Sequence, residues 1–220
     1  MNAAIILAGG RSERLSGGAP KQFRSVCGKP LVAYSLEAFD VCNGIGAIVV
    51  VSPEKWREII PAVDTHCIFA APGETRQHSI YNALAKLEGF NCDLAVIHDA
   101  ARPLVTPEDV NACLQAAEGY DGATPALEMT DTVYRSMDGS EISGLINRDE
   151  LFAGQTPEVY NYRKYFLAHE GADLSRIRGS SELAVAADMR IRLYPGRREN
   201  IKITTESDWK YLFYLLESVK

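Results

Sequence analysis

The sequence has few of the features that mark membrane, secreted or zinc-binding proteins. None of its apolar runs approaches the roughly 20 residues that a membrane span needs. No basic residue precedes the short apolar stretch at the N-terminus, so we expect neither a secretion nor an import signal. The five cysteines and four histidines are scattered, and no two cysteines form a Cys-x-x-Cys motif. We therefore expect free thiols in a cytoplasmic protein rather than disulfides or structural zinc.

Two common nucleotide-binding motifs are also absent. The chain contains neither a Walker P-loop nor the Gly-x-Gly-x-x-Gly dinucleotide fingerprint, which argues against an NAD-dependent oxidoreductase. Basic residues number 23 and acidic residues 29, giving a net charge of −6. This balance argues against nucleic acid as a partner. Hydrophobic residues at 46% and charged residues at 24% are typical of a soluble globular protein.

The first two-thirds of the chain alternates short aliphatic runs with amphipathic stretches. The patterns predict strands at 3–7, 45–51, 66–70 and 94–97, and helices at 30–39, 76–87 and from 106 onward. Ser52-Pro53 is predicted to open a further helix. This order is typical of an α/β protein with a mostly parallel, Rossmann-like sheet covered by helices on both faces.

After residue 122 the pattern changes. Short strands are predicted at 123–127, 132–135 and 141–145, with a hairpin turn at Asp138-Gly139. They indicate an inserted β-arm at about 131–147 that a partner subunit could hold. Helices are predicted at 162–169, 182–187 and 206–219, with a strand at 190–194. No repeat or linker interrupts the chain, so we predict a single domain over 1–220.

Glycines and cations follow the first predicted strand. Gly9 and Gly10 would allow the backbone to approach a ligand and turn N–H groups toward anionic oxygens. Arg11, Arg14 and Lys21 follow closely and supply positive charge. Since ligands of parallel α/β sheets bind at the carboxyl ends of the strands, this loop predicts an anion site, although solvated surface charges remain the plain alternative.

Other strand ends carry polar groups as well. Asp99 follows the strand at 94–97, where it could hold Mg²⁺ or only cap a turn. The segment 73–79 could contact a base or sugar, unless Thr75 merely caps the next helix. Arg148 and Lys202 suggest a second anion site near the first, although either could be a surface charge. Two anionic substrates joined over a metal indicate phosphoryl or nucleotidyl transfer.

These motifs carry a family resemblance. Leu7-Ala8-Gly9-Gly10-x-Ser12-x-Arg14-Leu15, followed by Pro20-Lys21-Gln22, resembles the signature loop of the sugar-nucleotide pyrophosphorylase-like nucleotidyltransferases. The further motifs are Gly73-x-x-Arg76-x-x-Ser79, His98-Asp99-Ala100-Ala101-Arg102-Pro103, Asp131-Thr132, Gln155-Thr156-Pro157 and Asn200-Ile201-Lys202. Together they resemble the 2-C-methyl-D-erythritol 4-phosphate cytidylyltransferases and their sister family, the ribitol-5-phosphate cytidylyltransferases. The implied fold is that of the nucleotide-diphospho-sugar transferases.

The resemblance implies a reaction in which CTP and a polyol phosphate give a CDP-polyol and pyrophosphate, with Mg²⁺ as cofactor. It implies roles for residues in three groups. CTP would be bound by Ala8, Gly9, Gly10, Gly73, Glu74, Arg76, Ser79 and Ala100. Catalysis would use Arg14 and Lys21 on the triphosphate, Lys202 beside the α-phosphate and Asp99 toward Mg²⁺. The polyol phosphate would meet Thr132, Arg148, Thr156 and Ser180.

The resemblance also implies a homodimer in which the β-arm reaches the neighbouring active site, so that Thr132 and Arg148 could serve the partner subunit. Two departures stand out: Ser12 replaces a usual glycine, and Ser181 stands where both families usually carry an acidic residue. The second leaves the acceptor open between methylerythritol phosphate, which we favour, and ribitol phosphate. A CTP-binding module without turnover is a third reading.

Overall fold

The computed structural model describes residues 1–10 and 18–217, which fold around an eight-stranded mixed sheet. The path of the sheet is β10-β7-β11-β6-β1-β4-β5, and β12 pairs with β7. Its strands are β1 (Asn2–Leu7), β4 (Ile45–Val51), β5 (Cys67–Ala70), β6 (Leu94–Asp99), β7 (Gly122–Glu128), β10 (Phe152–Gly154), β11 (Glu158–Asn161) and β12 (Ile191–Pro195). Only β10 and β11 run against the other strands of this sheet. The predicted mostly parallel α/β fold is confirmed.

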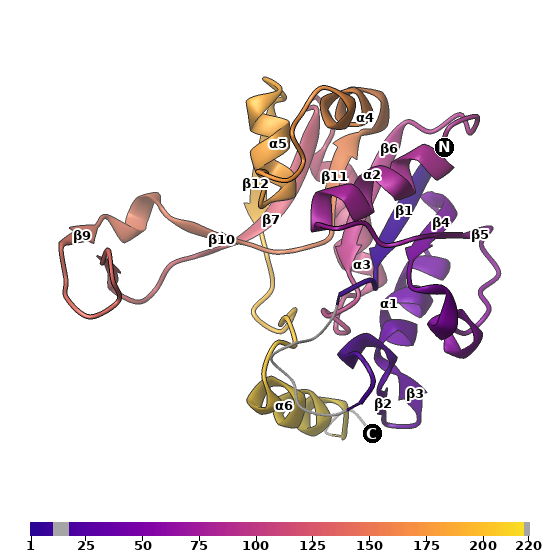
Figure 1. Ribbon diagram of the computed structural model, residues 1–220, viewed down its shortest axis with the longest axis horizontal. Helices are drawn as coiled ribbons and strands as arrows, with labels where there is room; N and C mark the ends of the chain where they lie inside the picture. The colour runs from indigo at the N-terminus through magenta and orange to yellow at the C-terminus, as the bar shows by residue number, and fades with distance from the viewer. Residues whose placement is uncertain (11–17, 218–220) are drawn as a thin grey trace.

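Helices cover both faces of the sheet (Figure 1). Alternate residues of β1 point to opposite faces, as strand geometry requires. Ala4 and Ile6 join the core with α1 (Leu31–Asp40) and α3 (Pro107–Ala116). On the other face the core contains residues of α2 (Arg76–Lys86), α4 (Tyr162–Glu170) and α5 (Ser180–Ala186). Burial on both faces explains why β1 and β4 are almost wholly aliphatic.

A small third core attaches the C-terminal helix α6 (Glu206–Glu217). Leu212 of this helix is buried with Val26, Leu31 and Ile203. Val26 belongs to a short hairpin of β2 (Ser25–Val26) and β3 (Lys29–Pro30), which directly follows the 3-10 helix η1 (Lys21–Phe23). The packing therefore brings the segment before α6 against the segment that follows the first loop.

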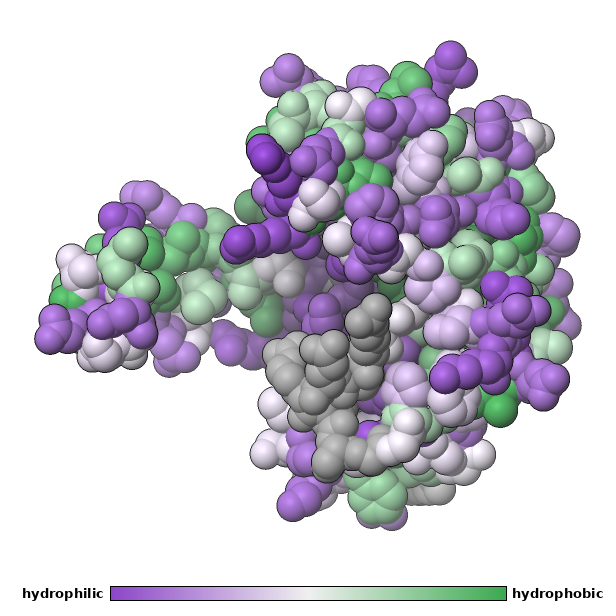
Figure 2. Space-filling model, in the orientation of Figure 1, coloured by the Kyte–Doolittle hydropathy of each residue, from purple (hydrophilic) through white to green (hydrophobic). Residues whose placement is uncertain are grey.

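The β-arm projects from the body between the end of β7 and the start of β10 (Figure 1). It contains the antiparallel pair β8 (Val133–Arg135) and β9 (Gly144–Ile146), followed by the 3-10 helix η3 (Arg148–Glu150). Figure 2 shows hydrophobic residues on the projecting arm. The arm and its base expose several large side chains that are apolar or aromatic. They are Tyr134, Met137, Ile142, Leu145 and Phe152.

Several details differ from the sequence-based expectations. Ser52-Pro53 opens the 3-10 helix η2 (Glu54–Ile59) rather than an α-helix, and no side chain caps it. The strand predicted at 141–145 starts later, because Ser136 and Asp138 organise the preceding residues into a turn. β10 and β11 were not predicted. Single-domain organisation over 1–220 remains a prediction. No helix in the described part of the chain is long and apolar enough to span a bilayer.

Candidate active site

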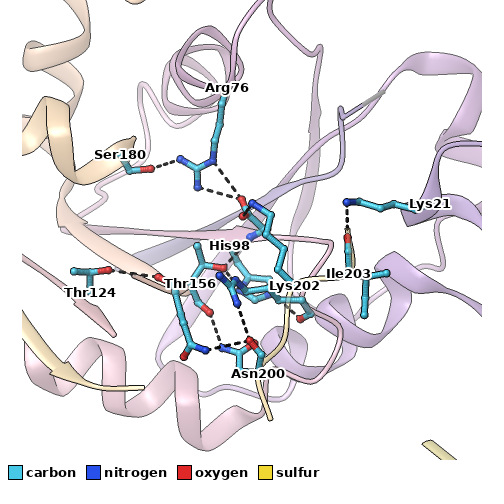
Figure 3. A network of polar contacts seen from close by, with 12 residues as sticks. Lys21, Arg76, His98, Thr124, Thr156, Ser180, Asn200, Lys202 and Ile203 are labelled. Carbon is cyan, nitrogen blue, oxygen red and sulfur yellow. Dashed lines mark hydrogen bonds and ion pairs between the residues drawn. The ribbon is translucent and has the colours of Figure 1, made fainter. Parts of the chain in front are cut away.

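Asp99 is the centre of a charged cluster at the carboxyl end of the sheet. It is the last residue of β6, where it pairs with Leu7 at the end of β1. Its Oδ1 accepts hydrogen bonds from Arg76 Nε at 3.3 Å and Nη2 at 3.1 Å, and its Oδ2 accepts one from Lys202 Nζ at 2.6 Å. Figure 3 shows Arg76 and Lys202 converging from separate elements. Residues 23 and 103 positions away from Asp99 thus meet at one carboxylate.

The ion pairs determine the charge of this cluster. Burial raises the pKa of Asp99, but Arg76 and Lys202 lower it more, so that it lies well below its usual range. Burial lowers the pKa of Arg76, but Asp99 and Glu158 raise it by more, so that it lies above its usual value. Both groups are therefore ionised at neutral pH.

Lys21 reaches the same region from η1. Its Nζ donates a hydrogen bond to the carbonyl of Ile203, the residue after Lys202 (Figure 3). The adjacent Gln22 donates to the carbonyls of Ala8 at 2.7 Å and Gly10 at 2.8 Å, which ties η1 to the first loop. The start of the first loop, Lys21 and the segment that carries Lys202 are thereby brought together. Arg14 and Ser12 lie outside the described residues.

Close contacts at the loops after β1 and β5 require a glycine in each loop. A Cβ on Gly9 would lie 2.8 Å from Cβ of Pro72, and one on Gly73 would lie 2.4 Å from Cβ of His78. Within the segment that follows β5, the Ser79 hydroxyl donates to the Thr75 carbonyl and accepts from the Gly73 N–H. Hydrogen bonds inside the segment 73–79, which is predicted to bind CTP, therefore hold its backbone in place.

The remaining residues of the predicted CTP site lie around this edge. Ala8 and Ala100 are buried at the ends of β1 and β6, whereas Glu74 is exposed. Thr75 does cap α2, since its side chain accepts a hydrogen bond from the N–H of His78. Capping and a role for the neighbouring residues in nucleotide binding are compatible.

Two of the predicted acceptor residues join the Asp99 cluster. The Ser180 hydroxyl, at the first turn of α5, accepts a hydrogen bond from Arg76 Nη1. Thr156 is buried, and its Oγ1 accepts a hydrogen bond from the N–H of Asp99 at 3.1 Å. Both side chains therefore hold the charged cluster in place in the structure described here.

The other two acceptor residues lie on the arm. Thr132 and Arg148 are exposed, and Arg148 Nη1 donates to the carbonyl of Thr130 at 2.6 Å. The structure does not bring them to Asp99 of the same chain. This placement agrees with the expectation that they serve a partner subunit, but it does not test that expectation.

Amide side chains position Lys202. Gln155 Nε2 donates to the carbonyls of Arg197 at 2.9 Å and Asn200 at 3.3 Å. Asn200 Nδ2 donates in turn to the carbonyl of Thr156 at 2.8 Å. Two motifs that resemble the family's signature therefore bind each other, which fixes the chain just before Lys202.

Sequence reasoning missed Glu158, a half-buried carboxylate two residues after Thr156. Its Oε2 accepts a hydrogen bond from the Tyr160 hydroxyl at 2.9 Å. Burial raises the pKa of Glu158, against the effects of Arg76, Ser180 and Tyr160, so that it lies above its usual value. The only sequence signal was its place beside the Gln155-Thr156-Pro157 motif, since β11 had not been predicted.

The geometry suits the binding of a polyanion more than that of a bare metal ion. Arg76 and Lys202 bind one buried carboxylate beside a glycine-rich loop, and Lys21 binds the carbonyl of Ile203, the residue after Lys202. Within residues 1–10 and 18–217, no three His, Cys, Asp or Glu side chains gather as metal ligands would. Fixed cations at such a site stabilise negative charge that develops on a phosphate during its transfer.

Comparison with known proteins agrees with this chemistry. The sequence profile of the 2-C-methyl-D-erythritol 4-phosphate cytidylyltransferases (IspD) matches residues 2–217. The chain belongs to this family. A cytidylyltransferase of that name from Cereibacter sphaeroides is 34% identical over 211 residues, which cover 94% of this chain and 93% of the relative.

Members of the family differ in length. The bifunctional enzyme IspD/IspF of Ruegeria pomeroyi is 35% identical over 210 residues, which cover 94% of this chain and 54% of that enzyme. The chain thus spans about half the length of this bifunctional relative. Among solved structures, the cytidylyltransferase of Thermus thermophilus superposes with a TM-score of 0.78 at 25% identity, covering 98% of each chain. The 4-diphosphocytidyl-2C-methyl-D-erythritol synthase of Anaerococcus prevotii gives a TM-score of 0.83 at 22% identity and supports the fold.

Proposed function

We propose that this chain transfers the cytidylyl group of CTP to the phosphate of 2-C-methyl-D-erythritol 4-phosphate and releases pyrophosphate, in isoprenoid precursor biosynthesis. The observation that carries the proposal is that Lys202 binds Asp99 while Lys21 binds the carbonyl of the next residue, Ile203, at the sheet edge that Gly9 and Gly10 follow. The membership of the family selects the reaction from among those that such a site could catalyse.

The chemistry is a displacement at the α-phosphorus of CTP. A phosphate oxygen of the acceptor forms a bond to that phosphorus, and the bond from it to the bridging oxygen of pyrophosphate breaks. The attacking oxygen is already ionised at neutral pH, so the reaction requires no general base. Lys21, Lys202 and, as the family resemblance implies, Arg14 would stabilise the negative charge of the five-coordinate phosphorus.

Lys202 has the freedom that this role requires. Its side chain is 42% exposed, whereas that of its partner Asp99 is 9% exposed. The ammonium group can therefore turn from the carboxylate to an incoming phosphate while Asp99 stays fixed by Arg76.

Mg²⁺ remains part of the proposal. A single carboxylate, Asp99, fits it, because magnesium in nucleotide sites is usually held by one or two carboxylates and otherwise by phosphate oxygens and water. When bound, the ion would neutralise charge on the triphosphate. Asp99, whose Oδ2 accepts a hydrogen bond from Lys202, would be the residue that holds the ion.

We further propose a homodimer in which each β-arm completes the partner's acceptor site with Thr132 and Arg148. The exposure of both residues, and of the apolar side chains on the same arm, supports this arrangement. We also propose that the protein is cytoplasmic, because its five cysteines are free thiols.

The test is a measurement of pyrophosphate release with CTP and Mg²⁺, comparing the two polyol phosphates as acceptors. We expect kcat/KM for methylerythritol phosphate to exceed that for ribitol 5-phosphate by about 100-fold, a typical discrimination between substrates that differ by a small group in a shaped pocket. A preference for ribitol 5-phosphate would assign the chain the sister activity, which the hydroxyl of Ser181 keeps open. CTP binding without product from either acceptor would overturn the proposal in favour of a module without turnover.

A further inference from the structure

His98 lies directly beneath the charged cluster and has no role in the mechanism above. It precedes Asp99 on β6, is fully buried, and packs against Phe39 with 5.3 Å between the ring centroids. Its Nε2 lies 3.1 Å from the carbonyl oxygen of Arg102, and its Nδ1 lies 3.1 Å from Oγ1 of Thr156. Figure 3 shows the imidazole and Thr156 side by side.

Arg102, His98, Thr156 and Asp99 form a chain of hydrogen bonds, and the backbone groups at its two ends fix the direction of each bond. A backbone carbonyl can only accept, so Nε2 of His98 carries the proton and donates to Arg102. The ring is fully buried against Phe39, and its nitrogens contact a carbonyl and a hydroxyl rather than a carboxylate, so it is neutral and its Nδ1 accepts. The Thr156 hydroxyl must therefore donate to Nδ1. The other end agrees, because Oγ1 of Thr156 accepts from the N–H of Asp99, which can only donate.

The chain of bonds also has a defined place in the sheet. The ladder between β11 and β6 ends at the pair of Glu158 and Ile97. Beyond that pair, the Thr156 side chain takes over and bonds the backbone of Asp99. The hydroxyl thus extends the contact between these two strands to the residue that binds Arg76 and Lys202.

We propose that His98 is a positioning residue for the transfer reaction. It holds the Thr156 hydroxyl in one orientation, and this hydroxyl holds the backbone of Asp99, so that the carboxylate presents its two oxygens to Arg76 and Lys202. The proposal deepens the proposed function and rests on it for the kinetic consequence. The proposal also assigns a role to Thr156. Its hydroxyl donates its one proton to His98 and accepts from the backbone of Asp99, so it does not donate to the acceptor phosphate.

Two substitutions separate the two bonds of the ring. In His98→Asn the amide oxygen lies near the position of Nδ1 and can still accept from Thr156, whereas the donor to Arg102 is lost. In His98→Gln the amide nitrogen can reach Arg102, and the acceptor for Thr156 is lost. We expect kcat to fall roughly 10- to 100-fold in His98→Gln and less than about 5-fold in His98→Asn, with KM for CTP nearly unchanged, because small displacements of reacting groups have effects of this size.

A double-mutant cycle tests whether His98 acts through Thr156. In a Thr156→Val background, where the hydroxyl is already gone, His98→Gln should cost less than about 3-fold in kcat. Equal losses in His98→Asn and His98→Gln, or multiplicative losses in the double variant, would overturn the proposal and leave His98 a core residue. If Thr156→Val instead raised KM for the acceptor with kcat unchanged, Thr156 would bind the phosphate and the proposal would also be overturned.

A spectroscopic readout keeps this inference separate from the proposed activity. The ¹⁵N chemical shifts of the His98 ring in the wild-type protein report which nitrogen carries the proton, whether or not the protein turns over any acceptor. We expect the proton on Nε2 at pH 7, and a change in the Nδ1 shift when Thr156 is replaced by Val. A proton on Nδ1, or a Nδ1 shift that ignores Thr156→Val, would contradict the proposal even in an active enzyme.

Discussion

At the scale of single residues, the site depends on the ion pairs of one carboxylate, Asp99, with Arg76 and Lys202. Asp99 accepts hydrogen bonds from Arg76 on one oxygen and from Lys202 on the other. Lys21 contacts the carbonyl of the residue after Lys202. Since all of these contacts are polar and partly exposed, phosphate oxygens can compete for the two lysines while Arg76 remains bound to Asp99.

Lys21→Ala should lower the rate of cytidylyl transfer by on the order of 100-fold or more, because one charge-stabilising donor is lost at the α-phosphate. The measurement is single-turnover transfer of CMP at saturating CTP. Lys210→Ala is the matched control, since Lys210 is an exposed lysine on α6, and it should react like the wild type. A folded Lys21→Ala protein with near-normal rates would remove Lys21 from the mechanism.

Site residues could be predicted from the sequence where a local pattern or a family motif marked them. Lys21, Asp99 and Lys202 were found because each follows a recognisable strand or belongs to a motif of the family. The contacts of His98 and Glu158 were not predicted. His98 contacts Thr156, 58 residues away, and Glu158 is placed by the pairing of β11 with β6, which no local pattern encodes.

At the scale of elements, the helices and the parallel strands were the predictable part. Their signals are continuous: a buried aliphatic strand, as in β4, or a capping box, as at Thr106 and Asp109 before α3. The two strands of the main sheet that were missed, β10 and β11, are short, and they return antiparallel between β6 and β7 or at the sheet edge. Pairing of this kind is decided by tertiary contacts rather than by the sequence of the segment.

Two buried histidines make the packing of the elements sensitive to acid. Burial lowers the pKa of both His98 and His169 to about 4, against about 6.5 in an unfolded chain. Below pH 6.5 the unfolded state therefore binds more protons. The free energy of unfolding should be fully retained above about pH 6.5 and decrease by up to about 1.4 kcal/mol per pH unit for each histidine as the pH falls toward 4.

Urea unfolding at pH 7.5, 6.5 and 5.5 measures this dependence. His169 donates from Nδ1 to the carbonyl of Tyr165 at 2.8 Å, within α4 and away from Asp99. The variant His169→Gln should be less stable at pH 7.5 but lose less stability on acidification than the wild type. An identical loss in both proteins would show that His169 is not the titrating group.

At the scale of the whole molecule, the arm is the feature that the body leaves unpaired. Met137 is 90% exposed and Leu145 is 72% exposed. Apolar side chains gathered in this way on an extended hairpin are typical of a surface that another subunit covers. Thr132 and Arg148 lie on the same extension, so the acceptor site and the dimer are coupled in our proposal.

The double substitution Met137→Asp and Leu145→Asp should shift the protein from dimer to monomer and raise KM for the acceptor, because buried charges oppose association. Sedimentation velocity at micromolar concentration, together with the transfer assay, measures both effects. Val41→Asp is the control, since Val41 is 65% exposed at the end of α1. A wild-type protein that is monomeric and fully active would refute the role of the arm.

The most direct test of the account is a crystal structure of this protein with CTP and Mg²⁺. We expect the α-phosphate to lie between Nζ of Lys21 and Nζ of Lys202, with the side chain of Lys202 turned away from Asp99 and the backbone of Gly9 and Gly10 against the nucleotide. A nucleotide seated elsewhere, or one whose α-phosphate contacts neither lysine while Lys202 stays paired with Asp99, would contradict it.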